Sequence, residues 1–514
     1  MSRTTKSTLN SLVGLICSIL SSILSFFLRG AFIRLLGLEY AGAGSLFADI
    51  LKILNLVDLG VSNAILVRLY RSCAKNDVEE TELYLVIYKR VCQILAIVIT
   101  IGGLLCLPFL NYLVKDRPTF PEPLWALFLI ILTNSYVGHS LGYKSIIFTA
   151  KQERFIKTLI QYGGLFLLHG LQLLSLLIYR NIYLYLLIPL LTITLRFIVS
   201  DVIAWRRYHV QYKTKRTLST DDKKELFKDV GSLSVYKICR TLDATVDTLL
   251  ISRFVSVAMT GIYGSFGMIF GALNELLGVF NDGMIASIGD LHTSGEKRRL
   301  ADVFYQSFHF TYLLFGICAV TLVPFVSDFV RWWIGHTLPD SCVYIIILNF
   351  VMCGFGMNVA TFRNAMGIFQ KGWLRPAFTA GLNLFFSLML VMRIGLLGTL
   401  LGTTIARLLT LVWYDPYLVC RYGFSCRPYK YYLRYATYAV AIATFAWGLL
   451  FLRSIIAPMN GFVSALWHGI LYLFCATIAL TGVGFLFSEQ KDIIIRIQKM
   501  LKTVHGKACS KVND

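Results

Sequence analysis

Charged side chains recur at helical spacing inside apolar segments of this chain. Segment 46–60 carries Asp49, Lys52, Asn55 and Asp58 among leucine, isoleucine and valine. At about 100° per residue these side chains share one half of a helix, and the other half is apolar. Each charge facing hydrocarbon would cost about 2.5–3.5 kcal/mol, so the polar half must face a cavity or other helices.

We predict that Lys52 and Asn55 contact a substrate in such a cavity. The carboxylates Asp49 and Asp58 would pair with cations or bind a coupling ion. The alternative is an internal Asp49–Lys52 pair that only fixes the packing of the helix.

A second apolar segment, 235–254, repeats this arrangement. Four ionisable side chains lie on an arc of about 120°, and an arginine follows near the outer end. They are Lys237, Arg240, Asp243, Asp247 and Arg253. The cations suit phosphate oxygens, which arginine binds bidentately, and the carboxylates suit a coupling proton or sodium ion. A structural network of salt bridges is the alternative, because unpaired charges would not stay buried.

Three more arginines are candidates for binding anionic groups of a substrate. Arg29 and Arg34 close the first apolar run near the outer face, although arginine at a span end also extends to lipid headgroups. Arg196 lies deep in the run 190–201, where its stem cannot comfortably reach either interface. We therefore predict that Arg196 faces a cavity.

The composition explains why buried charges stand out in this chain. Of 514 residues, 56% are hydrophobic and 15% are charged, with a mean hydropathy of +0.67. Soluble domains carry roughly 25% charged residues, so the sequence predicts an all-α, polytopic membrane protein. Apolar runs near the ~20 residues that cross hydrocarbon predict about fourteen spans. They fall near 9–33, 43–67, 91–114, 124–148, 158–179, 183–204, 232–253, 263–287, 304–327, 341–361, 374–392, 395–419, 432–452 and 463–487.

Lysine and arginine concentrate in alternate loops, which indicates the orientation of these spans. The basic loops are expected in the cytoplasm, so both termini are predicted to be cytoplasmic. The same bias, with attraction to anionic headgroups, accounts for the net charge of +21 without nucleic-acid binding.

The longest polar break, 205–231, divides the chain. It predicts a six-helix bundle at 1–204, a cytoplasmic linker at 205–231 and a second six-helix bundle at 232–420. Two additional spans follow within 421–487, and 488–514 forms a basic amphipathic tail on the cytoplasmic surface.

The two sides of this break resemble each other. Segments 37–55 and 256–274 align without gaps, which pairs Gly42 with Gly261 and Asn55 with Asn274. Each copy closes one span and opens the next. This pattern favours a duplicated transporter with its site between the repeats.

No motif for an enzyme or a bound metal accompanies these features. The eight histidines form no ligand cluster, and no Walker A, GxSxG or HExxH pattern appears. We expect no enzymatic activity and no cofactor, with transport driven by an ion gradient or by the membrane potential.

Four segments resemble one family of transporters. They read FIRLLGLEYAGAGSLFADILKILNLVDLGVSNAI, LDATVDTLLISRFVSVAMTGIYGSFGMI, VPFVSDFVRWWIG and IGLLGTLLGTTIA. In this order they resemble the bacterial polysaccharide repeat-unit flippases (Wzx-like) of the multidrug/oligosaccharidyl-lipid/polysaccharide exporter (MOP) superfamily. The resemblance implies two MATE-like six-helix bundles around a central cavity, in the bacterial inner membrane. It also implies export of an undecaprenyl-pyrophosphate-linked oligosaccharide for capsule, O-antigen or lipopolysaccharide synthesis, with polysaccharide polymerase machinery as a partner.

Three other functions stay open at this stage. A cation-coupled multidrug antiporter would need acidic cavity groups, whereas here lysine and arginine accompany the buried aspartates. A flippase for the cell-wall lipid precursor shares the substrate chemistry. A polysaccharide polymerase or glycosyltransferase would need a large outer loop or cytoplasmic domain, which the sequence does not contain.

Overall fold

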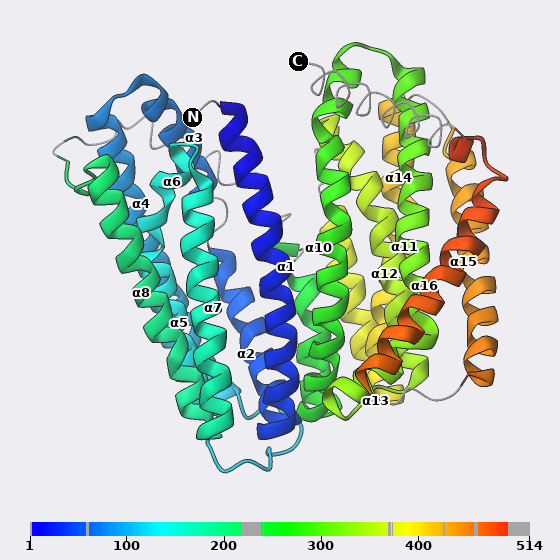
Figure 1. Ribbon diagram of the computed structural model, residues 1–514, viewed down its shortest axis with the longest axis horizontal. Coiled ribbons are helices and arrows are strands. Elements are labelled where there is room, and N and C mark those ends of the chain that lie inside the picture. Colours follow the sequence, from blue (N-terminus) through cyan, green and yellow to red (C-terminus); the bar gives the residue numbers. More distant parts are fainter. Residues whose placement is uncertain are drawn as a thin grey trace, which may run out of the picture. The chain divides into compact units, whose positions relative to one another are not determined.

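Helices formed by the apolar runs build the protein (Figure 1). The computed structural model describes residues 3–57, 61–214, 216, 238–239, 241–368, 372, 374–424, 427–456 and 461–491. Within these residues the regular structure is entirely helical. The predicted fold class, an all-α polytopic membrane protein, is therefore confirmed.

The chain divides into two compact units, Met1–Met268 and Ile269–Asp514. The first contains α1 (Arg3–Leu36), α2 (Leu38–Leu54), η1 (Asn55–Val57), α3 (Val61–Lys75), α4 (Val78–Cys106), η2 (Leu107–Phe109), α5 (Leu124–Leu141), η3 (Gly142–Ser145), α6 (Ile146–Ala150), α7 (Arg154–Ile178) and α8 (Ile182–Tyr208). Residues 241–254 are also helical, and α10 (Val257–Thr293) crosses the boundary between the units. The predicted linker 205–231 lies mostly outside the described residues, so that domain boundary stays a prediction.

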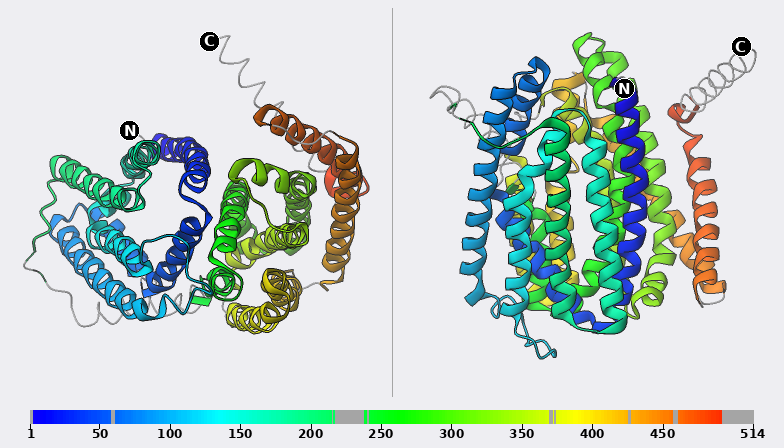
Figure 2. Two further views of the ribbon diagram at one scale, coloured as in Figure 1. Left: turned by 90° about the horizontal axis from the view of Figure 1, so that it is seen from below. Right: turned by 60° about the vertical axis from the view of Figure 1, so that its left-hand side comes forward.

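The second unit continues from α10. It contains α11 (Lys297–Ile334), α12 (Asp340–Ala365), α13 (Arg375–Leu409), α14 (Tyr414–Leu418), η5 (Val419–Phe424), α15 (Tyr429–Ile455) and α16 (Phe462–Gly484). The last two helices, orange to red in Figure 2, pack against α11 and correspond to the two additional spans predicted within 421–487. Residues 492–514 of the predicted amphipathic tail lie outside the described residues.

Eleven helices among the described residues are long and apolar enough to cross a membrane. Three of the fourteen predicted spans do not appear as separate helices of this kind in the described part of the chain. Span 43–67 is divided into α2, η1 and α3, and span 232–253 is described only in part. Spans 374–392 and 395–419 form one element that reverses direction. The chain is a multi-pass membrane protein.

The reversal inside α13 depends on three glycines. Gly395 has a φ of +59°, a conformation that residues with a side chain rarely adopt. Beyond it, a Cβ on Gly398 would overlap the carbonyl of Leu390, and one on Gly402 would overlap Ser387. The two arms of α13 therefore pack antiparallel, so closely that no side chain fits at Gly398 or Gly402.

Polar side chains join the two arms as well. The Ser387 hydroxyl donates to the Thr399 carbonyl at 3.0 Å, and Thr403 donates to Asn383 Oδ1 at 3.0 Å. Such interhelical hydrogen bonds satisfy polar groups that hydrocarbon would leave unpaired.

The predicted internal repeat has a structural counterpart within the first unit. A Cβ on Gly42 would overlap the carbonyl oxygen of Val257, and a Cβ on Gly261 would lie 2.5 Å from the carbonyl oxygen of Leu38. The repeat pairs Gly42 with Gly261 and Leu38 with Val257, so the two contacts are reciprocal. Reciprocity of this kind is what a local two-fold relation between the repeats predicts.

Adding a methyl group at this crossing should separate the two helices. We expect Gly42→Ala to lower the stability of the purified protein by about 1–3 kcal/mol or more, because backbone atoms rather than a mobile side chain block the space. Gly44→Ala on the same helix is the matched control, since nothing lies within 4 Å of its Cβ. Equal thermal unfolding midpoints for the two variants in detergent would contradict the crossing.

Candidate functional site

A polar, basic pocket of about 250 Å³ lies within the first unit. It is built by η3, by the first half of α7 and by the second half of α8. The lining residues are Gly142, Ser145, Lys157, Ile160, Gln161, Arg196, Phe197 and Ser200. Two cations and three neutral polar side chains therefore surround one cavity.

Local packing fixes Arg196 in this pocket. Its side chain runs over Gly164 of α7, where a Cβ would be only 3.5 Å from the Cβ and Cδ of the arginine. Its guanidinium also lies 4.9 Å from the ring centroid of Phe197. The packing of α7 against α8 brings Arg196 and Lys157 to the same cavity.

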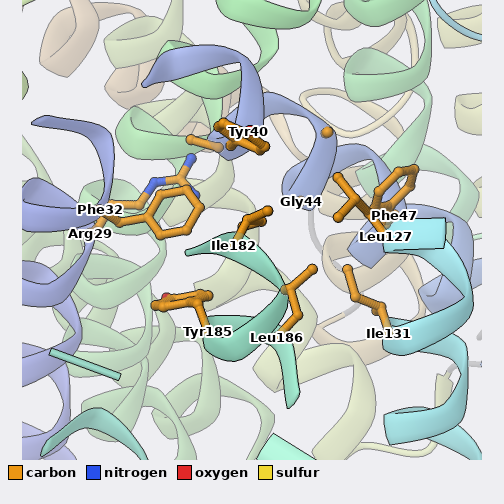
Figure 3. A pocket seen from close by; sticks show the side chains of 12 residues that line it. Arg29, Phe32, Tyr40, Gly44, Phe47, Leu127, Ile131, Ile182, Tyr185 and Leu186 are labelled. Atoms are coloured by element: carbon orange, nitrogen blue, oxygen red, sulfur yellow. The ribbon is translucent and has the colours of Figure 1, made fainter. Parts of the chain in front are cut away.

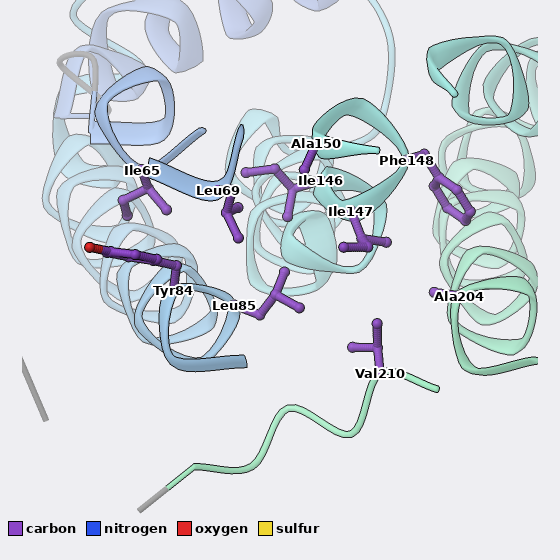
Figure 4. Close-up of a cluster of buried hydrophobic side chains, with 10 residues drawn as sticks. All are labelled: Ile65, Leu69, Tyr84, Leu85, Ile146, Ile147, Phe148, Ala150, Ala204 and Val210. Atoms are coloured by element: carbon purple, nitrogen blue, oxygen red, sulfur yellow. The ribbon is translucent and has the colours of Figure 1, made fainter. Parts of the chain in front are cut away.

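The η3 wall is anchored from both sides. Lys144 forms an ion pair of 2.9 Å with Asp201 of α8. The following helix α6 contributes to a buried apolar cluster (Figure 4), whose members are Ile65, Leu69, Tyr84, Leu85, Ile146, Ile147, Phe148, Ala150, Ala204 and Val210. This cluster joins α3, α4, α6 and α8, so the pocket rests on a packed base.

The pocket carries uncompensated positive charge. Within the described part of the chain, no carboxylate forms an ion pair with Lys157 or Arg196. The nearby Asp201 is engaged by Lys144, and Lys157 experiences the charges of Arg154 and Arg196. Like charges held together favour an anion between them, and phosphate oxygens match both an arginine fork and a lysine.

A second cavity of about 250 Å³, shown in Figure 3, surrounds Arg29. It is lined by Arg29, Phe32, Tyr40, Ala41, Ala43, Gly44, Phe47, Leu127, Ile131, Ile182, Tyr185 and Leu186. Phe32 and Tyr185 pack with ring centroids 4.7 Å apart, and Tyr40 stacks on Phe120 while donating a hydrogen bond to Glu122. This cavity is amphipathic, with aromatic walls and one guanidinium.

Arg29 also bridges α2 and α10 where these two helices cross. It donates to the Gly261 carbonyl at 3.0 Å, to Ser265 Oγ at 3.3 Å and to Ser45 Oγ at 3.4 Å. These acceptors are neutral and lie on α2 and α10. Arg29 thus joins three helices, and a role in substrate binding stays a prediction.

Asp49 and Lys52 form the local pair that was the alternative to a cavity role. Lys52 Nζ lies 2.5 Å from Asp49 Oδ1, with the carboxylate buried and the lysine side chain 62% exposed. Asn55 follows at the start of η1, and its Oδ1 is buried without a hydrogen-bond partner among the described residues. The Oδ1 of Asn274, its counterpart in the repeat, is in the same state.

The remaining predicted residues are dispersed. Arg34 is exposed in the last turn of α1, and the Arg253 guanidinium lies 4.3 Å from the ring centroid of Tyr112. Asp247 is buried and accepts a hydrogen bond of 3.2 Å from the Tyr263 hydroxyl, and Asp243 is half-buried. Asp58, Lys237 and Arg240 lie outside the described residues.

The sequence analysis singles out Arg196 but not Lys157, which lines the same pocket. The predicted span 158–179 begins just after Lys157, whereas α7 begins at Arg154 and includes it. Its spacing of four residues from Gln161 marks a polar helical stripe that extends the span. That stripe gives no indication of contact with α8, which only the tertiary structure supplies.

No protein-family model and no curated protein sequence matches the chain. Solved structures do match. The lipid II flippase MurJ in an inward closed conformation superposes with a TM-score of 0.67 at 14% identity, over 91% of this chain and 98% of that one. The chain has the fold of the MOP-superfamily transporters.

Two MATE transporters share this MOP fold. An inward-facing multidrug resistance transporter matches with a TM-score of 0.60 at 14% identity, over 84% of this chain and 98% of that one. A point mutant of the transporter VcmN from Vibrio cholerae matches with a TM-score of 0.55 at 16% identity, over 83% of this chain and 99% of that one. At these identities the likeness establishes the fold, and the substrate has to be argued from the residues of this chain.

Proposed function

We propose that this protein is a flippase-type exporter of a polyprenyl-pyrophosphate-linked oligosaccharide, moved outward across the bacterial inner membrane for surface polysaccharide synthesis. The observation that carries the proposal is the cavity in which Lys157 and Arg196 lie together without a paired carboxylate in the described part of the chain. A site of this charge selects an anion.

The chemistry of the pocket matches a pyrophosphate and the first part of a glycan. Arg196 can hold two phosphate oxygens in its planar fork, and Lys157 supplies a point charge. Gln161, Ser145 and Ser200 add neutral hydrogen-bonding groups suited to sugar hydroxyls. The polyprenyl tail would stay in the bilayer.

The membrane potential supplies a driving force for this direction of transport. An anion moving outward gains about 2.3 kcal/mol per charge per 100 mV when the inside is negative. The protein then has to replace the hydration of the headgroup with cationic contacts while access alternates. Counter-transport of a proton or sodium ion at Asp243, Asp247 or Asp58 is an additional proposal, and transport in vesicles that ignores both gradients would contradict it.

A flippase for the cell-wall lipid precursor is the second candidate, favoured by the likeness to MurJ. A multidrug antiporter for cations fits less well, because Asp49 is paired with Lys52 and the basic pocket would repel a cation.

A deletion strain separates these functions. We expect it to accumulate the lipid-linked surface-polysaccharide unit on the cytoplasmic face, and a plasmid copy of the wild type to remove the accumulation. Accumulation of lipid II instead would assign the protein to cell-wall synthesis. The absence of any lipid-linked intermediate, together with increased drug sensitivity, would contradict the flippase function.

A further inference from the structure

The second unit carries a groove that the transport proposal does not use. It has a volume of about 390 Å³ and lies along the first arm of α13 and the junction between α13 and α14. Its lining is mainly apolar and aromatic, with one arginine and one threonine: Gly372, Leu374, Arg375, Phe378, Leu382, Leu409, Thr410, Trp413 and Tyr414. This combination provides space for an apolar chain beside a cationic group.

The groove opens on the outer face of a membrane-spanning element. Phe378 is 64% exposed and Trp413 is 49% exposed, although Arg375–Phe424 has the length and hydropathy of a membrane span. The predicted topology places this end of α13 at the cytoplasmic interface, where tryptophan and tyrosine are enriched. A lipid chain could therefore enter the groove from the bilayer.

A charged cluster lies at the polar end of the groove. Asp415 accepts a hydrogen bond of 2.8 Å from Arg363 on one oxygen and lies 3.0 Å from Arg375 on the other. The Nε of Arg375 is also buried without an acceptor among the described residues, and Arg375 is the member of this cluster that lines the groove.

We propose that this groove binds an anionic phospholipid of the surrounding membrane. The lipid phosphate lies at Arg375, which lines the groove, and one acyl chain lies along Phe378 and Leu382. Charge complementarity selects an anionic headgroup, because the ammonium of a zwitterionic lipid opposes the attraction. The proposal does not depend on which substrate the protein transports.

Trp413 on the rim of the groove provides a direct reporter. The full chain is reconstituted into phosphatidylcholine vesicles that contain either brominated phosphatidylglycerol or brominated phosphatidylcholine at the same mole fraction. The difference in quenching between the wild type and Trp413→Phe isolates the Trp413 signal. We expect about fivefold preferential occupancy by phosphatidylglycerol, the ratio that corresponds to ~1 kcal/mol of headgroup attraction per arginine.

Arg375→Gln should reduce this preference to about one. Arg393→Gln, an exposed arginine at the other end of the first arm of α13, should leave it unchanged and is the matched control. No preference in the wild type, or an undiminished preference in Arg375→Gln, would overturn the proposal.

A second variant applies if Arg375→Gln does not fold. Leu382→Phe narrows the apolar part of the groove without touching the charged cluster, so it should lower Trp413 quenching by brominated phosphatidylglycerol. Unchanged quenching in Leu382→Phe would overturn the proposal. So would protection of Trp413 by undecaprenyl phosphate at mole fractions well below that of phosphatidylglycerol, since the groove would then hold a polyprenyl chain.

Discussion

Replacing Asp415 by asparagine is expected to lower the free energy of unfolding by about 3–5 kcal/mol. Asp415 is fully buried. It accepts a hydrogen bond from Arg363, whose side chain is 2% exposed, and forms an ion pair with Arg375. Removing the carboxylate charge takes from both guanidinium groups the buried carboxylate that they contact, and the loss of a buried ion-pair partner costs more than an exposed pair contributes. The measurement is the thermal unfolding midpoint and the yield of monodisperse protein in detergent.

Asp328→Asn provides the matched control for Asp415→Asn. Asp328 pairs with Arg453 at 2.9 Å, but both side chains are about a quarter exposed. Solvent screens that pair, so its loss should cost no more than about 1 kcal/mol. If the two variants unfold at the same midpoint, Asp415 does not hold the charged cluster together.

Arg196→Gln is expected to reduce transport by roughly tenfold to 150-fold while the protein still folds. The substitution removes charge-assisted hydrogen bonds to the proposed phosphate group, each worth about 1.5–3 kcal/mol. In the described part of the chain Arg196 forms no ion pair, so the substitution leaves no carboxylate without its partner. The free energy of unfolding should therefore vary little. The measurement is transfer of a fluorescent polyprenyl-pyrophosphate oligosaccharide in proteoliposomes, normalised to the amount of inserted protein.

Two other variants make the Arg196 prediction specific. Arg196→Lys keeps the charge but loses the planar fork, so it should recover only part of the transport rate. Arg299→Gln, an exposed arginine on α11, should behave as wild type. Wild-type transport by Arg196→Gln would exclude the basic pocket from the substrate path and leave the MOP fold unaffected.

The different surroundings of the charged residues explain why Asp415→Asn should affect stability and Arg196→Gln should affect transport. Asp415 is buried between Arg363 and Arg375, so its loss affects the stability of the fold. Lys157 and Arg196 line open space without such a centre, so their charge is available to a ligand. The presence of cations within apolar helices does not separate the two clusters, since both contain them.

The sequence by itself determined the membrane class, the position of most of the span-length helices and the internal repeat. Apolar runs of span length have one solution in a bilayer, because the backbone must satisfy its own hydrogen bonds. The Asp49–Lys52 pair was also accessible as an alternative, since a spacing of three residues places both side chains on one helix face. The glycines that align in the repeat are those that meet at the crossing of α2 and α10.

Only the tertiary structure decided which charges share a cavity. Lys157 and Arg196 are brought together because α7 packs against α8, a contact that no local pattern encodes. In the same way, Asp415 meets Arg363 and Arg375 only after α13 has reversed at Gly395 and returned its second arm along the first. Periodicity fixes the face of a helix on which a charge lies, whereas the identity of its neighbour depends on packing between helices that are distant in the chain.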